Sequence, residues 1–211
     1  MTAALVATLL AGCADDSWSR PRTGPTAVGS LGTGFVPDQT PSPAATVVPS
    51  PGSWDGIAPA SGYRVVLLTY GDDNPTTTLV EAVESWARTH RADLRTVRAD
   101  SPDDLLAAAV RATDLHPDLV VAVGDALVDP LTLVTADHLD QQYLVVGAEL
   151  AEPTHNVTAV DWTGAGFRGE GLGLPSAYDP ASFTPDRCTE AVRVGVAAVL
   201  GGHSGYVYWI D

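Results

Sequence analysis

Five acidic side chains and one amide follow directly after apolar, β-rich segments of this sequence. They are Asp72, Asp73, Asn74, Asp125, Glu149 and Asp161. Carboxylate and amide oxygens accept hydrogen bonds, so the set suits a ligand that presents hydroxyl groups or an amine. Acids at such places also stabilise the N-terminus of the following helix, where the helix dipole is positive. Asp125 fits either role, and capping is the ordinary role at the other positions.

Other patterns resemble catalytic or cofactor-binding motifs, but their positions in the predicted fold or their missing residues do not fit those motifs. Residues 164–169 match G-x-G-x-x-G, which brings backbone N–H groups to a pyrophosphate. That fingerprint belongs on the first strand–helix turn of the fold, whereas this copy follows the fifth predicted strand. Glu190 has the spacing of the acid that binds the ribose in such sites, but it falls inside a predicted helix. Residues 202–205 lack the last glycine of a nucleophile elbow. The five histidines have no zinc-type spacing. We therefore expect no cofactor, no metal and no enzymatic activity.

The charge and composition narrow the function classes further. The chain has no lysine, so P-loop and Schiff-base chemistry are excluded. The formal net charge of -15 argues against nucleic acid as a partner, because a basic surface supplies most of that affinity. It argues equally against adsorption of the protein surface to anionic lipid.

Cys13 provides a different route to a membrane. A short apolar run from Leu5 to Gly12 ends in Leu-Ala-Gly-Cys, which resembles the lipobox of bacterial lipoprotein signals, although no Lys or Arg precedes the run. The run is shorter than the roughly 20 residues that span a bilayer. We therefore predict a signal over 1–13, with acylated Cys13 holding the protein to the bilayer on the extracytoplasmic face of the cell membrane. Cys188 is then left without a partner, either as a reactive thiol or, as favoured here, as a small buried hydrophobe.

Residues 14–61 differ in composition from the rest of the chain. Half of the 16 prolines fall there, among Gly, Ser, Thr and Ala. Such a segment buries too little apolar surface to offset the entropy of ordering it, so we predict a disordered tether spanning roughly 40 Å. Trp18, Phe35 and Trp54 are exceptions in this segment: by default they are expected to be exposed, with local docking as the alternative.

Strands and helices alternate from residue 63 onward. Apolar runs predict strands over 63–69, 94–97, 118–124, 142–146, 156–162 and 206–210. Capping residues predict helices that begin at Thr78, Ser101, Asp129 and Thr184 and end near 90, 115, 138 and 200. This order predicts one α/β domain over 62–211 with a doubly wound, mostly parallel sheet of about six strands. The carboxyl ends of such strands form the usual ligand crevice, which is where the acids lie.

The order of several of these segments resembles the basic membrane protein family. The segments are PDLVVAVGDAL, YLVVGAEL, NVTAVDW and GFRGEGLG, within residues 63–174. The resemblance implies a substrate-binding lipoprotein of an ABC importer with a type I periplasmic-binding-protein fold, a nucleoside as one class of ligand, and a helix in 164–173. The aromatic residue that follows the acid in the family's first loop is missing after Asp72 and Asp73, and the chain has room for a single lobe.

Two hypotheses follow for a non-catalytic, membrane-anchored lobe. In the first, the strand-end crevice binds a small polar solute such as a nucleoside, with an ABC permease as partner. In the second, the lobe has lost ligand capture and acts as a surface interaction or regulatory lipoprotein with another surface protein as partner.

Overall fold

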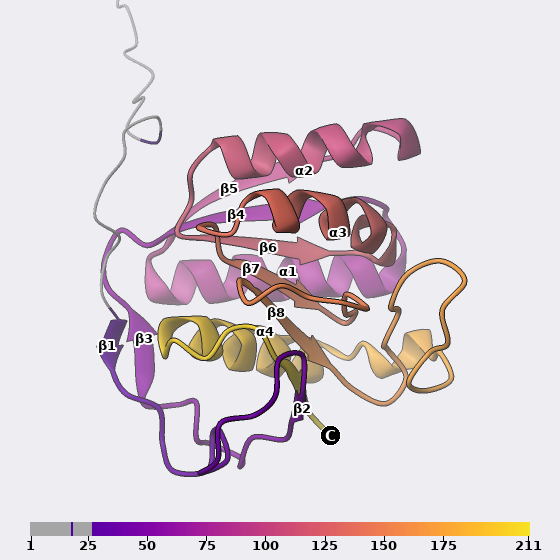
Figure 1. Ribbon diagram of the computed structural model, residues 1–211. Helices are drawn as coiled ribbons and strands as arrows, with labels where there is room; N and C mark the ends of the chain where they lie inside the picture. Colours follow the sequence, from indigo (N-terminus) through magenta and orange to yellow (C-terminus); the bar gives the residue numbers. More distant parts are fainter. Residues whose placement is uncertain (1–17, 19–26) are drawn as a thin grey trace, which may run out of the picture.

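The computed structural model describes Trp18 and residues 27–211 (Figure 1). The lipobox and Cys13 lie outside the described residues. A seven-stranded parallel sheet runs through the centre in the order β2-β9-β8-β7-β6-β4-β5. Its strands are β2 (Thr46–Val47), β4 (Arg64–Thr69), β5 (Asp93–Arg98), β6 (Leu119–Val123), β7 (Tyr143–Val146), β8 (Val157–Asp161) and β9 (Val207–Trp209). All six predicted strands are confirmed, together with the α/β fold class.

Helices cover both faces of the sheet and enclose two cores. The helices are α1 (Asn74–His90), α2 (Leu105–Asp114), α3 (Val128–Asp137) and α4 (Pro185–Leu200). Helices α1 and α4 cover one face, and α2 and α3 cover the other. Every residue of β4, β6, β7 and β8 is buried, as expected for parallel strands covered on both sides.

Two of the four predicted helix starts need correction. Helix α1 begins four residues before Thr78, because Asp73 caps it by accepting hydrogen bonds from the Thr76 N–H at 2.9 Å and the Thr76 hydroxyl at 2.8 Å. At α2, Ser101 makes no capping bond, and a 3-10 turn over Pro102–Asp104 precedes the helix.

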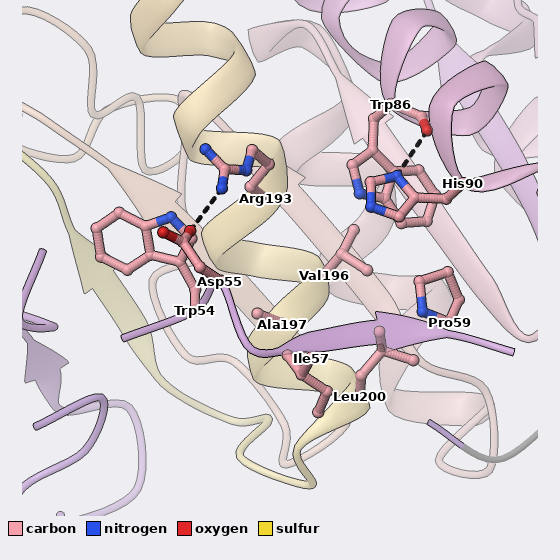
Figure 2. Close-up of a pocket in the computed structure, with 10 residues that line it drawn as sticks. All are labelled: Trp54, Asp55, Ile57, Pro59, Trp86, His90, Arg193, Val196, Ala197 and Leu200. Carbon is pink, nitrogen blue, oxygen red and sulfur yellow. Dashed lines mark hydrogen bonds and ion pairs between the residues drawn. The ribbon is translucent and has the colours of Figure 1, made fainter. Parts of the chain in front are cut away.

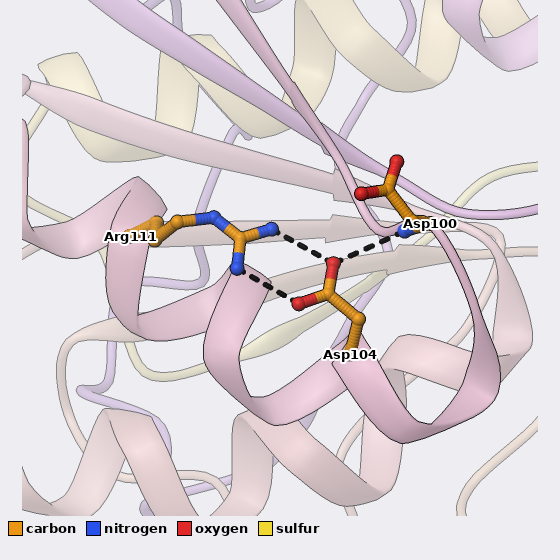
Figure 3. A network of polar contacts seen from close by, with 3 residues as sticks. All are labelled: Asp100, Asp104 and Arg111. Atoms are coloured by element: carbon orange, nitrogen blue, oxygen red, sulfur yellow. Dashed lines mark hydrogen bonds and ion pairs between the residues drawn. The ribbon is translucent and has the colours of Figure 1, made fainter.

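Asp104 organises the start of α2 in place of Ser101. Its carboxylate accepts the Asp100 N–H at 3.0 Å and holds Arg111 through two contacts of 2.8 Å (Figure 3). The Arg111 hydrogen bond is the largest cause that lowers the pKa of Asp104 to about 2. The other two starts agree closely with the sequence: α3 begins one residue before Asp129, and Thr184 caps α4 through the Arg187 N–H.

The prediction of a disordered tether over 14–61 is wrong for residues 27–61. In that segment β1 (Ala27–Gly29) pairs with β3 (Ile57–Pro59), and β2 adds a seventh strand beside β9. Phe35 is 1% exposed and its ring lies 5.1 Å from the ring of Tyr208. Composition failed as a guide because a few large side chains bury enough surface on a preformed domain to order a Pro-rich chain.

The segment closes against α1 and α4 at a narrow seam (Figure 2). Trp54 is buried there and Asp55 forms an ion pair with Arg193 of α4. On the far side of a cavity of about 50 Å³, His90 stacks on Trp86 with 4.8 Å between the ring centroids. The volume is that of a few atoms, so the seam is a packed contact rather than a ligand pocket.

Trp18 is also buried, contrary to expectation. Its indole N–H donates to Asp93 at 2.6 Å, and the guanidinium of Arg95 lies 4.4 Å from the ring centroid. A cation at this distance over an indole face is attractive. Trp18 therefore docks at the amino end of β5, on the edge opposite to the predicted ligand crevice.

Candidate functional site

The strand order creates a crevice at the carboxyl ends of β4 and β6. The chain runs from β4 to β5 on one side and then crosses to β6 on the other side of β4. The connection after β4 leads towards β5 and the connection after β6 leads towards β7, so the two diverge and their loops are separated there. The loop after β4 ends at Asp73, and the loop after β6 contains Gly124 and Asp125.

A cavity of about 80 Å³ occupies this crevice. It lies between the start of α1, the end of β6 and the segment that precedes α4. Its lining residues are Asp73, Pro75, Thr76, Leu79, Gly124, Asp125, Tyr178 and Phe183. Only two of the six predicted ligand-binding residues, Asp73 and Asp125, line it.

The remaining residues of the first loop do not reach the cavity. Asp72 and Asn74 are exposed, and backbone carbonyls of both accept bonds from threonine hydroxyls of α1. Asp73 itself has the structural role of helix cap, with both carboxylate oxygens bonded to Thr76. The sequence could not separate these three neighbours, because only the chain direction at the start of α1 decides which one faces the crevice.

Asp125 is the most available acid of the cavity. Asp125 is half-buried and begins the short 3-10 turn Asp125–Leu127, whose N-cap is Gly124. Burial first, and then the negative charge of Asp73, raise the pKa of Asp125 to about 6. Its carboxyl group therefore changes charge close to neutral pH, and a bound cation or hydrogen-bond donor would shift that equilibrium.

Asp161 and Glu149 are the other two predicted acids at the carboxyl edge of the sheet, outside the lining of the cavity. Asp161 is fully buried, and its Oδ1 accepts the Trp162 N–H at 2.8 Å. Burial is the largest cause that raises the pKa of Asp161 to about 7, and the charges of Glu149 and Asp125 add to it. Glu149 is paired with Arg168 at 2.7 Å, an ion pair rather than a well-aligned hydrogen bond. Burial still raises the pKa of Glu149, and Arg168 opposes the rise.

Two aromatic residues of the cavity were missed by the sequence reasoning. Tyr178 and Phe183 come from the segment between β8 and α4, and their ring centroids lie 6.0 Å apart. Phe183 also meets Trp162 edge-on at 4.9 Å. Phe183 directly precedes the cap of α4, a position whose apolar side chain usually packs inward, and this was a usable signal. No comparable signal marks Tyr178.

The glycines of 164–169 shape the loop after β8. Gly164, Gly166 and Gly169 all have positive φ, so the predicted helix over 164–173 is wrong. A Cβ on Gly164 would lie 2.6 Å from Ser182, and one on Gly166 would lie 2.4 Å from Pro175. These glycines therefore let the loop pack closely under the segment that carries Tyr178.

Residue types that favour other chemistry are not assembled in the described part of the chain. Trp18 and residues 27–211 contain no group of three His, Cys, Asp or Glu side chains that could hold a metal ion. Cys188 is fully buried, and burial raises its thiol pKa to about 12, which suits a small hydrophobe rather than a nucleophile. Among the same residues, no helix is long and apolar enough to cross a membrane.

Comparison with known proteins gives structural likenesses only. The sequence matches no known family and no curated protein. An ABC transporter solute-binding protein from Aeropyrum pernix K1 is 19% identical with a TM-score of 0.43 over 48% of this chain and 29% of its own. One from Conexibacter woesei DSM 14684 is 17% identical with a TM-score of 0.41 over 48% of this chain and 36% of its own.

A third similar structure is a predicted lipoprotein fragment from Peptoclostridium difficile 630. It is 16% identical with a TM-score of 0.45, over 67% of this chain and 98% of the fragment. The chain spans about a third of the length of the two solute-binding proteins. At these identities and scores the likeness describes only an arrangement of strands and helices, and membership of the basic membrane protein family is not established.

Proposed function

We propose that this chain is an extracytoplasmic protein, anchored through Cys13, whose α/β lobe binds a small polar solute at the cavity between β4 and β6. The observation behind the proposal is that Asp73 and Asp125 face one cavity at the point where the strand connections diverge. Tyr178 and Phe183 supply the aromatic wall that the first loop lacks. The proposal contains no catalytic step.

The cavity volume limits the solute. Typical ligand pockets enclose roughly 300–1,000 Å³, whereas this one has about 80 Å³. A nucleoside exceeds that volume, so it would enter only with displacement of the segment that carries Tyr178, which is 44% exposed. A smaller solute, or the polar end of a larger one, fits without that movement.

A thermal-shift screen followed by calorimetry tests the binding. Amino acids, sugars and nucleosides are added to the full chain, and a saturable rise in melting temperature is expected for one class. Asp125→Asn should reduce the rise at a given solute concentration, since it removes a charge that faces the cavity. Asp140→Asn, at an exposed aspartate on the opposite edge, should leave it intact. A screen without any saturable shift would contradict solute binding.

The anchor is tested separately by cell fractionation. Cys13→Ala should move the protein from the membrane fraction to the soluble extracytoplasmic fraction, because the acyl chains are lost. Cys188→Ala is the matched control, since that thiol is buried in the core. Retention of Cys13→Ala on the membrane would refute the anchor. For an importer, the partner is an ABC permease.

A second function is favoured by one surface feature. Leu172, Leu174 and Tyr178 are 51%, 45% and 44% exposed within one short segment. Exposed apolar side chains that cluster in this way are typical of contact surfaces with other proteins. In this alternative the lobe is a surface interaction or regulatory lipoprotein. Crosslinking on cells should then recover one surface protein with the wild type and lose it with Leu172→Asp, while the solute screen stays negative.

A further inference from the structure

The carboxyl edge of the sheet carries four carboxyl groups and one arginine, Arg168. Asp73 and Asp125 line the cavity. Asp161 lies within electrostatic reach of both Asp125 and Glu149. Arg168 is already paired with Glu149. The edge therefore has an excess of negative charge, which favours a cationic ligand and opposes an anionic one.

One oxygen of this cluster lacks a donor. Asp161 is 0% exposed, and its Oδ2 accepts no hydrogen bond from any residue that the structure describes. That oxygen lies beside the loop at Gly166, where an added Cβ would come within 2.9 Å of it. Buried polar atoms are rarely left unsatisfied, because an unpaired one loses its bond to water without replacement. When Asp161 is ionised this oxygen is an acceptor, and an ammonium group, which has only donors, is its chemical complement.

The residues that line the cavity also suit an ammonium group. Tyr178 and Phe183 place two aromatic rings opposite Asp73 and Asp125. The charges of these two acids act on the phenol, because they add to burial in raising the pKa of Tyr178. Aromatic faces attract cations, and a ring pair combined with carboxylates is the usual surround for an ammonium group.

The volume sets how much of the ligand enters. A cavity of roughly 150 Å³ holds benzene, with its six carbon atoms. The volume of about 80 Å³ found here is a little over half of that, so it accommodates three or four heavy atoms. An alkylammonium end group has this size.

We propose that the solute taken by this lobe is a cationic amine, whose ammonium end enters between Asp73, Asp125, Tyr178 and Phe183 while the acids around Asp161 complete the negative edge. This inference rests on the proposed solute-binding function and names the class of its ligand. It separates amines from uncharged nucleosides and sugars and from carboxylate solutes.

Binding is measured on the full chain by two-dimensional 1H–15N NMR with matched probes. Propylammonium chloride is compared with 1-propanol, which has the same shape without the charge, at constant chloride concentration. We expect the amides of residues 124–126 and 178–183 to shift in a saturable manner with propylammonium. A single charge-assisted contact is worth about 1.4 kcal/mol or more, so the amine should bind at least roughly tenfold more tightly than the alcohol.

Two variants separate a loss of binding from a loss of folding. Asp125→Asn removes the charge and should weaken propylammonium binding roughly tenfold. Tyr178→Leu removes an aromatic face at a position that is 44% exposed, and should weaken propylammonium binding several-fold with little change in melting temperature. Asp140→Asn is the control and should bind the amine as the wild type does.

Each outcome decides the inference. Selective, variant-sensitive binding of propylammonium supports it. Equal or tighter binding of 1-propanol overturns it. Failure of both probes, with a nucleoside or sugar binding at the same amides, overturns the amine class and leaves the proposed binding site standing. Failure of every solute class overturns both proposals.

Discussion

Asp161 is expected to make the stability of this protein fall as the pH rises toward neutrality. The pKa of Asp161 rises from 3.8 to about 7, chiefly because the carboxyl group is buried. The folded state therefore holds a proton that the unfolded state releases. The stabilisation is complete below pH 3.8 and is lost as the pH rises through 7.

The magnitude follows from the size of the shift. A rise from 3.8 to about 7 is about three pKa units, and each unit is worth about 1.4 kcal/mol, so the whole loss is on the order of 4 kcal/mol. At pH 5 the unfolded chain is already mostly ionised at this position. About 2.5 kcal/mol of the loss therefore falls between pH 5 and pH 8.

Asp161→Asn removes this titration and keeps an oxygen that can accept the Trp162 N–H. Urea unfolding of the wild type and the variant, followed by tryptophan fluorescence, gives the free energy of unfolding at pH 5, 6.5 and 8. We expect the free energy of unfolding of the variant, relative to that of the wild type, to rise by about 2.5 kcal/mol from pH 5 to pH 8. A shallower slope should remain in the variant, since the pKa of Asp125 is also raised to about 6.

The control is Asp140→Asn, where the side chain is exposed. Its difference from the wild type should be the same at every pH. The reasoning about Asp161 is refuted if Asp161→Asn and the wild type show parallel stability profiles from pH 5 to pH 8. A profile in which the wild type gains on the variant as the pH rises would reverse the sign and exclude a raised pKa.

Three further predictions concern packing and surface charge. Phe35→Ala should cost about 3–5 kcal/mol of stability in urea unfolding, since Phe35 is 1% exposed, whereas a disordered tether would show no effect. Gly195→Ala should reduce the free energy of unfolding by roughly 1–3 kcal/mol, and so lower the melting temperature, because the added Cβ would lie 2.3 Å from Leu144. Arg111→Gln should return the pKa of Asp104, measured by carboxyl 13C NMR, from about 2 toward 3.8.

Each of these three predictions has a control variant that isolates its physical cause. Val48→Ala, at a position 66% exposed in the same N-terminal segment, is the control for Phe35→Ala. Gly173→Ala, where an added Cβ meets nothing within 4 Å, is the control for Gly195→Ala. For Asp104, Arg88→Gln should change nothing, because Arg88 pairs with Glu84 elsewhere on the surface. An Asp104 pKa that stays near 2 without Arg111 would contradict the assigned cause.

The central part of the fold was predictable because its signals are local. The continuous apolar run of β6 and the capped start of α4 at Thr184 each depend on a few neighbouring residues, and both agree with the structure. The candidate site was predictable only in outline. Strand ends indicated Asp73 and Asp125, but the same rule also selected Asp72 and Asn74, which do not line the cavity.

The segment 27–61 shows where local reasoning stops. Its composition is that of a disordered chain, and its order depends on Phe35, Trp54 and Val47 meeting surfaces formed by residues more than a hundred positions later. Such contacts leave no periodic pattern in the segment itself. The same holds for Tyr178, which reaches the crevice from the loop after β8.

The sequence by itself determined the alternation of strands and helices, the acidic balance without lysine and the prediction of an anchor at Cys13. Each of these depends on residue type and near-neighbour spacing. The tertiary structure decided which acids share a cavity and that Tyr178 and Phe183 close it. It also decided that a buried oxygen of Asp161 has no donor among the residues that the structure describes. Burial and electrostatic coupling are properties of distance in space, and only the folded chain sets those distances.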